Sequence, residues 1–201
     1  MSDFIQDGTG NGYRARVNAD NHLHTRAISE SGGTDAALAG NLYNINTETI
    51  NLTSANASAN ASALLYMKNT DTVPWIVNRV FYNAGPSTGG SGDFLAEVIA
   101  NPSTGTLISG GSSLTPHNLN FGSSQELTST VLKGAEGSTI TDGTVRVSTI
   151  IPVAGTRVLI SFDSIILEAG SSIAVRITPQ TGNSSMDIQV GFNLYRCMLE
   201  V

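Results

Sequence analysis

A few side chains of this 201-residue chain have the types and spacing from which an active site could be built. Gly85-Pro86-Ser87-Thr88-Gly89 matches the G-x-S-x-G pattern that surrounds the nucleophilic serine of many hydrolases. That pattern works because a sharp turn between a strand and a helix exposes the serine hydroxyl. Here Gly90-Ser91-Gly92-Asp93 follows, and a run so rich in glycine does not begin a stable helix. We therefore interpret the segment as a hairpin loop rather than a nucleophile.

The other candidate catalytic side chains are dispersed along the chain. A serine mechanism would need His117 as the base, with Asp93 or Asp142 to orient it, and nothing in their spacing supports that role. Glycoside hydrolysis would need two carboxylates at a fixed separation, and the sequence offers no cluster that suggests such a pair. The chain is accordingly predicted not to be an enzyme.

His22-Leu23-His24 is the pattern that comes nearest to a metal site. Residues i and i+2 of a strand face the same way, so both imidazoles could reach one ion. Two ligands are too few for a closed zinc site, and only a threefold assembly would complete it. The single cysteine, Cys197, excludes an internal disulfide and is expected to be a small buried side chain. We expect no bound metal and no cofactor.

Gly8, Gly10 and Gly12 superficially suggest a phosphate-binding loop. The dinucleotide fingerprint has the spacing G-x-G-x-x-G and lies between a strand and a helix, whose first amides meet the pyrophosphate. Here the spacing is G-x-G-x-G, and the Tyr13–Val17 stretch that follows alternates like a strand. We interpret these glycines as part of a turn-forming or flexible segment.

The charge of the chain argues against nucleic acid and membrane partners. Its net charge is −6, its sequence pI is near 4.9, and its ten lysines and arginines are scattered one or two at a time. Nucleic-acid binding needs a concentrated basic stripe. The longest apolar runs, such as Ala63-Leu64-Leu65, are far shorter than the ~20 residues of a spanning helix. Met1-Ser2-Asp3-Phe4 does not open like a secretory leader, so we expect assembly in a cytoplasm.

From about residue 42 onward the apolar residues recur with a period of two, which is typical of half-buried strands. In Trp75–Tyr82, for example, Trp75, Val77 and Phe81 alternate with Ile76, Val80 and Tyr82. Further alternating stretches are 145–153, 158–162, 173–178 and 188–194. Clusters of Gly, Asn, Ser and Pro at 83–92, 101–105, 109–113, 134–143 and 178–185 predict turns between them. No segment shows a sustained helical pattern, so the sequence predicts an all-β fold, a β-sandwich of jelly-roll type.

Residues 1–40 differ from the rest because they are poor in large apolar side chains. Such a segment cannot bury enough area to fold by itself. We therefore predict two parts: an extended N-terminal attachment arm over 1–40 and a β-sandwich domain over 41–201 that folds alone.

Several segments, in their order along nearly the whole chain, resemble a recurring family of tailed-bacteriophage virion proteins. The opening resemblance lies in Asp7-Gly8-Thr9-Gly10-Asn11-Gly12-Tyr13-Arg14-Ala15-Arg16-Val17 and Asn21-His22-Leu23. It continues at 43–47, 85–90, 101–102, 105–110, 120–124, 133–134, 169–173 and 185–187. What the resemblance implies is a structural, non-enzymatic component of the virion.

Within that family we favour a capsid decoration (cement) protein, whose sandwich caps the lattice of the major capsid protein while its arm grips it. The alternatives are a neck, collar or tail-fibre component and, with less support, a carbohydrate-binding module. The expected partner-binding residues of the arm are Asp7, Gly8, Gly10, Gly12, Tyr13, Arg14 and Arg16.

Apolar residues on both faces of single predicted strands suggest a further partner. Leu95 and Ile99 lie opposite Ala96, Val98 and Ala100, and Trp75–Tyr82 has the same property. One sandwich core cannot bury both faces, so we expect a homo-oligomer. A trimer fits the threefold sites of a capsid lattice.

Overall fold

The computed structural model describes residues 16–17, 23–24, 32–53, 61–88, 93–151, 157–179 and 185–197, with backbone alone at 16–17, 23–24, 32, 86–88 and 157–164. The chain divides into two compact units, Met1–Ser31 and Gly32–Val201. In the first unit, β1 (Arg16–Val17) pairs antiparallel with β2 (Leu23–His24).

Strands are the main secondary structure of the second unit. It contains β3 (Leu42–Asn46), β4 (Ile50–Leu52), β5 (Ser62–Asn69), β6 (Trp75–Thr88), β7 (Phe94–Ala100), β8 (Ser112–Ser113), β9 (His117–Asn118), β10 (Ser129–Lys133), β11 (Thr144–Ile151), β12 (Arg157–Leu167), β13 (Ser172–Pro179) and β14 (Ser185–Arg196). Two short helices, α1 (Gly32–Leu38) and α2 (Thr106–Gly110), complete it.

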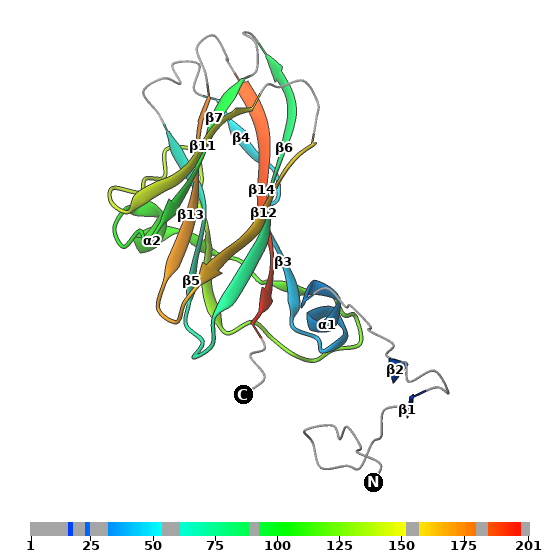
Figure 1. Cartoon of the computed structure of the whole chain (residues 1–201). Helices are drawn as coiled ribbons and strands as arrows, with labels where there is room; N and C mark the ends of the chain where they lie inside the picture. The colour runs from blue at the N-terminus through cyan, green and yellow to red at the C-terminus, as the bar shows by residue number, and fades with distance from the viewer. Residues whose placement is uncertain are drawn as a thin grey trace. The chain divides into compact units, whose positions relative to one another are not determined.

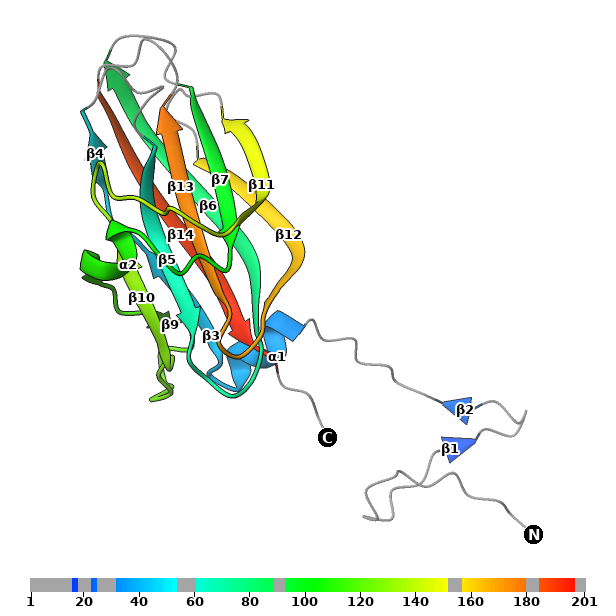
Figure 2. The same cartoon turned by 90° about the vertical axis from the view of Figure 1, so that its left-hand side faces the viewer.

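The strands form two antiparallel sheets that face each other (Figures 1 and 2). Sheet I has the order β11-β7-β13-β5-β10-β8, and sheet II has the order β12-β6-β14-β3-β9, with β4 paired to β14. The predicted all-β sandwich is therefore confirmed. Most successive long strands lie in opposite sheets, as a jelly roll requires, although the jelly-roll assignment itself stays a prediction.

The core lies between the sheets and is rich in aromatic side chains. Trp75, Tyr43 and Phe192 are almost completely buried, and the rings of Tyr43 and Trp75 meet edge to face with centroids 5.7 Å apart. The Arg196 guanidinium lies 5.2 Å from the centre of the Trp75 ring and also pairs with Asp71. These contacts seal one end of the core.

An irregularity in β6 corrects the predicted assignment of its faces. Leu194 pairs with Val77 and Asn193 with Arg79, so Asn78 is an extra residue in the ladder. A bulge of this kind shifts the alternation by one residue. As a result Trp75, Val77, Val80 and Tyr82 all belong to the core between the sheets, whereas the period of two placed them on opposite faces.

Part of the outer apolar face of sheet I is covered by the chain itself. Ala63, Tyr66, Ile99 and Ala174 form a second buried cluster with Leu107 of α2 and Ile140 of the loop that precedes β11. The side chain of Ile99 is 2% exposed. Ile99 is therefore covered by the chain and not by a second subunit. The expected contact of this face with another subunit stays a prediction, and Leu95, which is half-buried, is the β7 residue that remains available for it.

Two further expectations are corrected. Residues 83–88 belong to β6, not to a turn, because they pair with β14 as far as Thr88.

Residues 32–38 form helix α1, which packs through buried Ala36. Gly40 follows the helix with a φ of +73°, the left-handed conformation typical of a helix C-terminus. The compact unit thus begins at Gly32, ahead of the expected boundary at residue 41.

Candidate functional site

The predicted partner-binding residues of the arm lie largely outside the described residues. This holds for Asp7, Gly8, Gly10, Gly12, Tyr13 and Arg14. Arg16 is described through its backbone, which pairs with that of His24 across β1 and β2. His22 also lies outside the described residues, so the histidine pair remains an expectation about the sequence.

Ser87 occupies a different setting from the serine of a nucleophile elbow. It lies in β6 and pairs with Met186 of β14, whereas an elbow needs a sharp strand-to-helix turn. His117 lies in β9 at the far edge of the same sheet, and Asp93 immediately precedes β7.

Asp142 has a structural role in a loop. Its carboxylate accepts hydrogen bonds from Ser103 N at 2.9 Å, Ser103 Oγ at 2.5 Å and Thr104 N at 2.9 Å. These donors, with the Ser103 hydroxyl first among them, hold the pKa of Asp142 well below its usual value. The carboxylate therefore ties the loop after β7 to the loop before β11.

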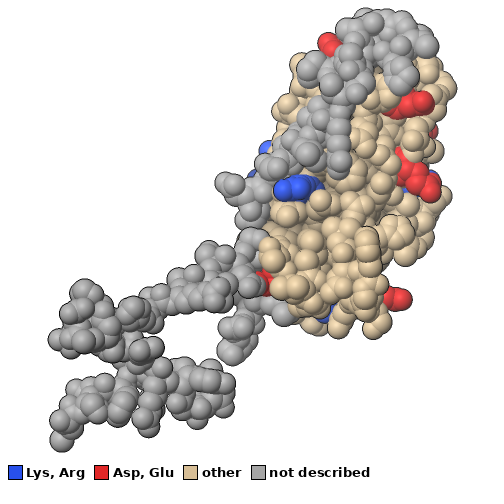
Figure 3. All heavy atoms as spheres, turned by 90° about the vertical axis from the view of Figure 1, so that its right-hand side faces the viewer, with Lys and Arg blue, Asp and Glu red and all other residues tan. Residues whose placement is uncertain are grey.

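The described residues contain no group of three or more His, Cys, Asp or Glu side chains that could hold a metal ion. Cys197 is a free, half-buried thiol. Within the same part of the chain, neither helix is long and apolar enough to cross a membrane. Figure 3 shows lysine and arginine side chains only as isolated spots on the face that it presents.

The outer face of sheet II carries amide side chains that bind one another. Asn44 Nδ2 donates to Asn193 Oδ1 at 2.7 Å. Gln189 joins its two neighbours, because its Nε2 donates to Asn46 Oδ1 at 2.7 Å and its Oε1 accepts from Asn83 Nδ2 at 2.6 Å. The described side chains of this sheet include no exposed aromatic ring on which a sugar could stack.

An apolar pocket opens on the side of the sandwich where β11 and β12 end the two sheets. We call it the β11–β12 pocket. Its volume is about 200 Å³, and its apolar lining consists of Val98, Ala100, Val147, Ile165, Ile166, Leu167 and Ile173. Val98, Leu167 and Ile173 belong to the buried core. The pocket is therefore a place where the core between the sheets reaches the surface.

Two features fix the rim of this pocket. Asn101 Oδ1 accepts from Ser172 N at 3.1 Å, and Ser172 Oγ donates to the carbonyl of Pro102 at 2.8 Å. On the opposite side, the ladder between β7 and β11 shifts between Val145 and Val147. Arg146 is the extra residue of that bulge, and among the described side chains it is the one charged residue that lines the pocket. Its exposed guanidinium makes no ion pair with any described residue.

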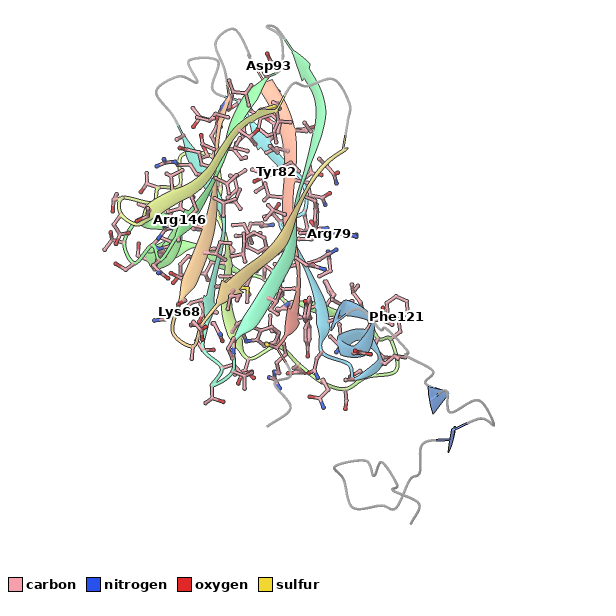
Figure 4. All side chains as sticks on the ribbon, viewed as in Figure 1. Lys68, Arg79, Tyr82, Asp93, Phe121 and Arg146 are labelled. Carbon is pink, nitrogen blue, oxygen red and sulfur yellow. The ribbon has the colours of Figure 1, made fainter. Side chains whose placement is uncertain are left out.

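A second exposed apolar surface lies beside α1. We call it the Phe121 corner; it consists of Leu38 (72% exposed), Leu119 (40%) and Phe121 (96%). Figure 4 shows Phe121 beside α1 and Arg146 on the other side of the same view. Phe121 is the one exposed aromatic ring among the described side chains.

The loop that carries Phe121 is held by a chain of side-chain to backbone hydrogen bonds. Asn118 Nδ2 donates to the carbonyls of Gly40 (2.7 Å) and Gln125 (3.1 Å). Asn120 N donates to Asn118 Oδ1 at 2.8 Å, and Gly122 N donates to Asn120 Oδ1 at 3.1 Å. The exposed ring is thus presented by an ordered loop.

Sequence reasoning did not find either surface as a site. Residues 120–124 and 169–173 were singled out only as segments of a resemblance, and they contain Phe121 and part of the pocket rim. A polar stretch of Asn, Gly and Ser around one phenylalanine is the signal that could have pointed to an exposed ring. The pocket has no local signal, because its lining comes from four strands that are far apart in the sequence.

Comparison with known proteins identifies no relative. No family model matches the chain, and no curated protein matches it. One solved structure, described as an alpha-amino acid ester hydrolase labelled with selenomethionine, aligns with a TM-score of 0.28 and 10% sequence identity. The alignment covers 67% of this chain and 25% of the hydrolase. A likeness that weak carries no conclusion about fold or activity.

Proposed function

We propose that this chain is a structural protein of a tailed-bacteriophage virion, and specifically a decoration protein that binds the major capsid protein lattice and stabilises the head. The observation that supports a binding role most directly is the distribution of exposed apolar residues. All six exposed large apolar side chains of the described residues lie at the Phe121 corner or on the edge strands β11 and β12. Apolar side chains gathered on a rigid scaffold mark interaction surfaces.

The division of the chain gives the proposal its second support. Met1–Ser31 is a unit separate from the sandwich, and it contains most of the segment that resembles the opening of the phage family. In this proposal the first unit engages the lattice, three copies associate, and the sandwiches cover the capsid surface. Tethered segments that engage one site together strengthen the attachment by avidity.

The test is rebinding to separated phage parts. Heads assembled without this chain, and tails purified separately, are mixed with the full chain and sedimented. We expect the full chain to sediment with heads and not with tails. Sedimentation with tails alone would replace the decoration role by the neck, collar or tail-fibre alternative. Binding to neither would contradict the virion proposal.

A control separates attachment from folding. A chain shortened to residues 32–201 keeps the complete compact unit, so it should remain folded and lose sedimentation with heads. If the shortened chain still sediments with heads as strongly as the full chain, the first unit is not the attachment segment.

A further inference from the structure

Of the two exposed apolar surfaces among the described residues, one projects a ring and the other is a hollow. The Phe121 corner projects a single aromatic ring from an ordered loop, and 96% of that side chain is exposed. The β11–β12 pocket is a hollow of about 200 Å³ with an apolar lining. An apolar cavity of about 150 Å³ in another protein is large enough to hold benzene, so a phenyl ring fits this one.

The charges around the two surfaces are also complementary. Arg146 lies at the pocket, and none of the described side chains that line the pocket is acidic. Beside the Phe121 corner, Asp35 lies on α1 and Glu126 on the segment that follows the Phe121 loop; both are exposed. Neither carboxylate makes an ion pair with a described residue. A contact between the two surfaces would bring Arg146 toward these acids, which favours correct orientation of the partners.

We infer that the partner of the Phe121 corner is a second copy of this chain, whose β11–β12 pocket receives the Phe121 ring. Binding through one ordered aromatic side chain in an apolar pocket is the usual form of an interaction hot spot. The hydrogen bonds of Asn118 and Asn120 order the Phe121 loop before binding, so little conformational entropy is lost on association.

This contact is head to tail, because ring and pocket lie on different surfaces of one chain. Such a contact closes into a ring when the rotation between copies allows it, and a ring of three copies is the trimer of the proposed function. Only the number of copies in the ring, three, rests on the proposed function. Self-association through Phe121 can be measured without any phage particle.

The experiment compares the unmodified full-length chain with four full-length variants by native mass spectrometry and analytical ultracentrifugation at micromolar concentration. Phe121→Ala removes the ring. Ala100→Phe fills the pocket from its own half-buried wall. Lys68→Ala, at an exposed position of β5 outside both surfaces, is the control. We expect the unmodified chain and Lys68→Ala to associate, and both Phe121→Ala and Ala100→Phe to be monomers with dissociation constants raised at least tenfold.

Mixing the two monomeric variants gives the decisive result. Phe121→Ala keeps an open pocket and Ala100→Phe keeps its ring, so the mixture should form a complex of one copy of each and grow no further. Circular dichroism checks that Ala100→Phe is folded, and Arg146→Glu provides a surface variant that should also weaken association. A monomeric unmodified chain, or a Phe121→Ala chain that associates normally, would overturn the inference. Head binding in the sedimentation test could still succeed in either case, so the two proposals fail separately.

Discussion

At the scale of single residues, a glycine leaves room for an aromatic ring on the outer face of sheet II. Gly191 lies in the middle of β14, where a Cβ atom would overlap the Phe81 ring and the Ile45 carbonyl. The Phe81 side chain lies on the outer face of sheet II, yet it is 3% exposed because it covers this glycine. Nothing in the alternating pattern distinguishes such a glycine from one in a turn.

Gly191→Ala is therefore expected to destabilise the fold. Overpacking of this kind costs about 1–3 kcal/mol, which thermal unfolding followed by circular dichroism would show as a lower Tm. Gly110→Ala is the matched control, because no atom lies within 4 Å of the Cβ position there. Equal Tm values for the two variants would contradict the packing described around Gly191.

Asp142 gives the fold a defined response to acid. Its pKa is held below 3.8 in the folded chain by the Ser103 and Thr104 donors. The folded state therefore binds this proton less readily than the unfolded state, and the carboxylate contributes stability above pH 3.8 that is lost as the pH falls below it. Asp142→Asn should lower the Tm at pH 7 and lose less stability than the unmodified chain between pH 4 and pH 2. Parallel pH curves for the two proteins would show that the carboxylate does not act in this way.

At the scale of secondary-structure elements, the longest strands could be predicted and the covering segments could not. The period of two located β11, β12, β13 and β14. The period of two failed in β6, where the bulge at Asn78 shifts by one residue the alternation between the two faces of the sheet. Helix α2 contributes one fully buried side chain, Leu107, so it has no apolar stripe that a helical pattern could reveal.

Helix α2 is predicted to stabilise the sandwich by covering the outer face of sheet I. Leu107→Ala removes the side chain that meets Ile99 and Tyr66 in the second cluster and should cost about 2–5 kcal/mol. Ile108→Ala, at a half-buried neighbouring position, should cost less. Denaturant unfolding measures both changes, and an equal effect of the two would contradict the assignment of Leu107 as the covering side chain.

Because of helix α1, the residue at which a shortened chain begins is expected to affect its unfolding temperature. A chain that begins at Gly32 keeps α1, whereas one that begins at Asn41 loses buried Ala36 and the Leu38 carbonyl that accepts from Asn120 Nδ2 at 3.3 Å. The first is expected to unfold at the same temperature as the full chain, and the second at a lower one. Identical melting of both shortened chains would place α1 outside the cooperative unit.

At the scale of the whole molecule, the amino-acid composition excluded classes of protein but did not identify a binding surface. The alternating apolar pattern was enough to predict a β-sandwich. The low charge without a basic stripe argued against a nucleic-acid partner. The candidate surfaces could not be predicted, since the β11–β12 pocket depends on how β7, β11, β12 and β13 meet in space. Apolar residues on both faces of a strand suggested an oligomer, and in β7 the chain itself covers one of them, Ile99.

The central claim is that this sandwich is a decoration protein on the head of a tailed phage. A cryo-electron microscopy reconstruction of the phage that encodes the chain tests it most directly. We predict density for the two-sheet sandwich on the outer capsid surface at threefold sites of the lattice, with three copies in contact and Phe121 of each at the β11–β12 pocket of the next. Density of this shape at the neck or tail, or purified particles that lack the chain altogether, would contradict the claim.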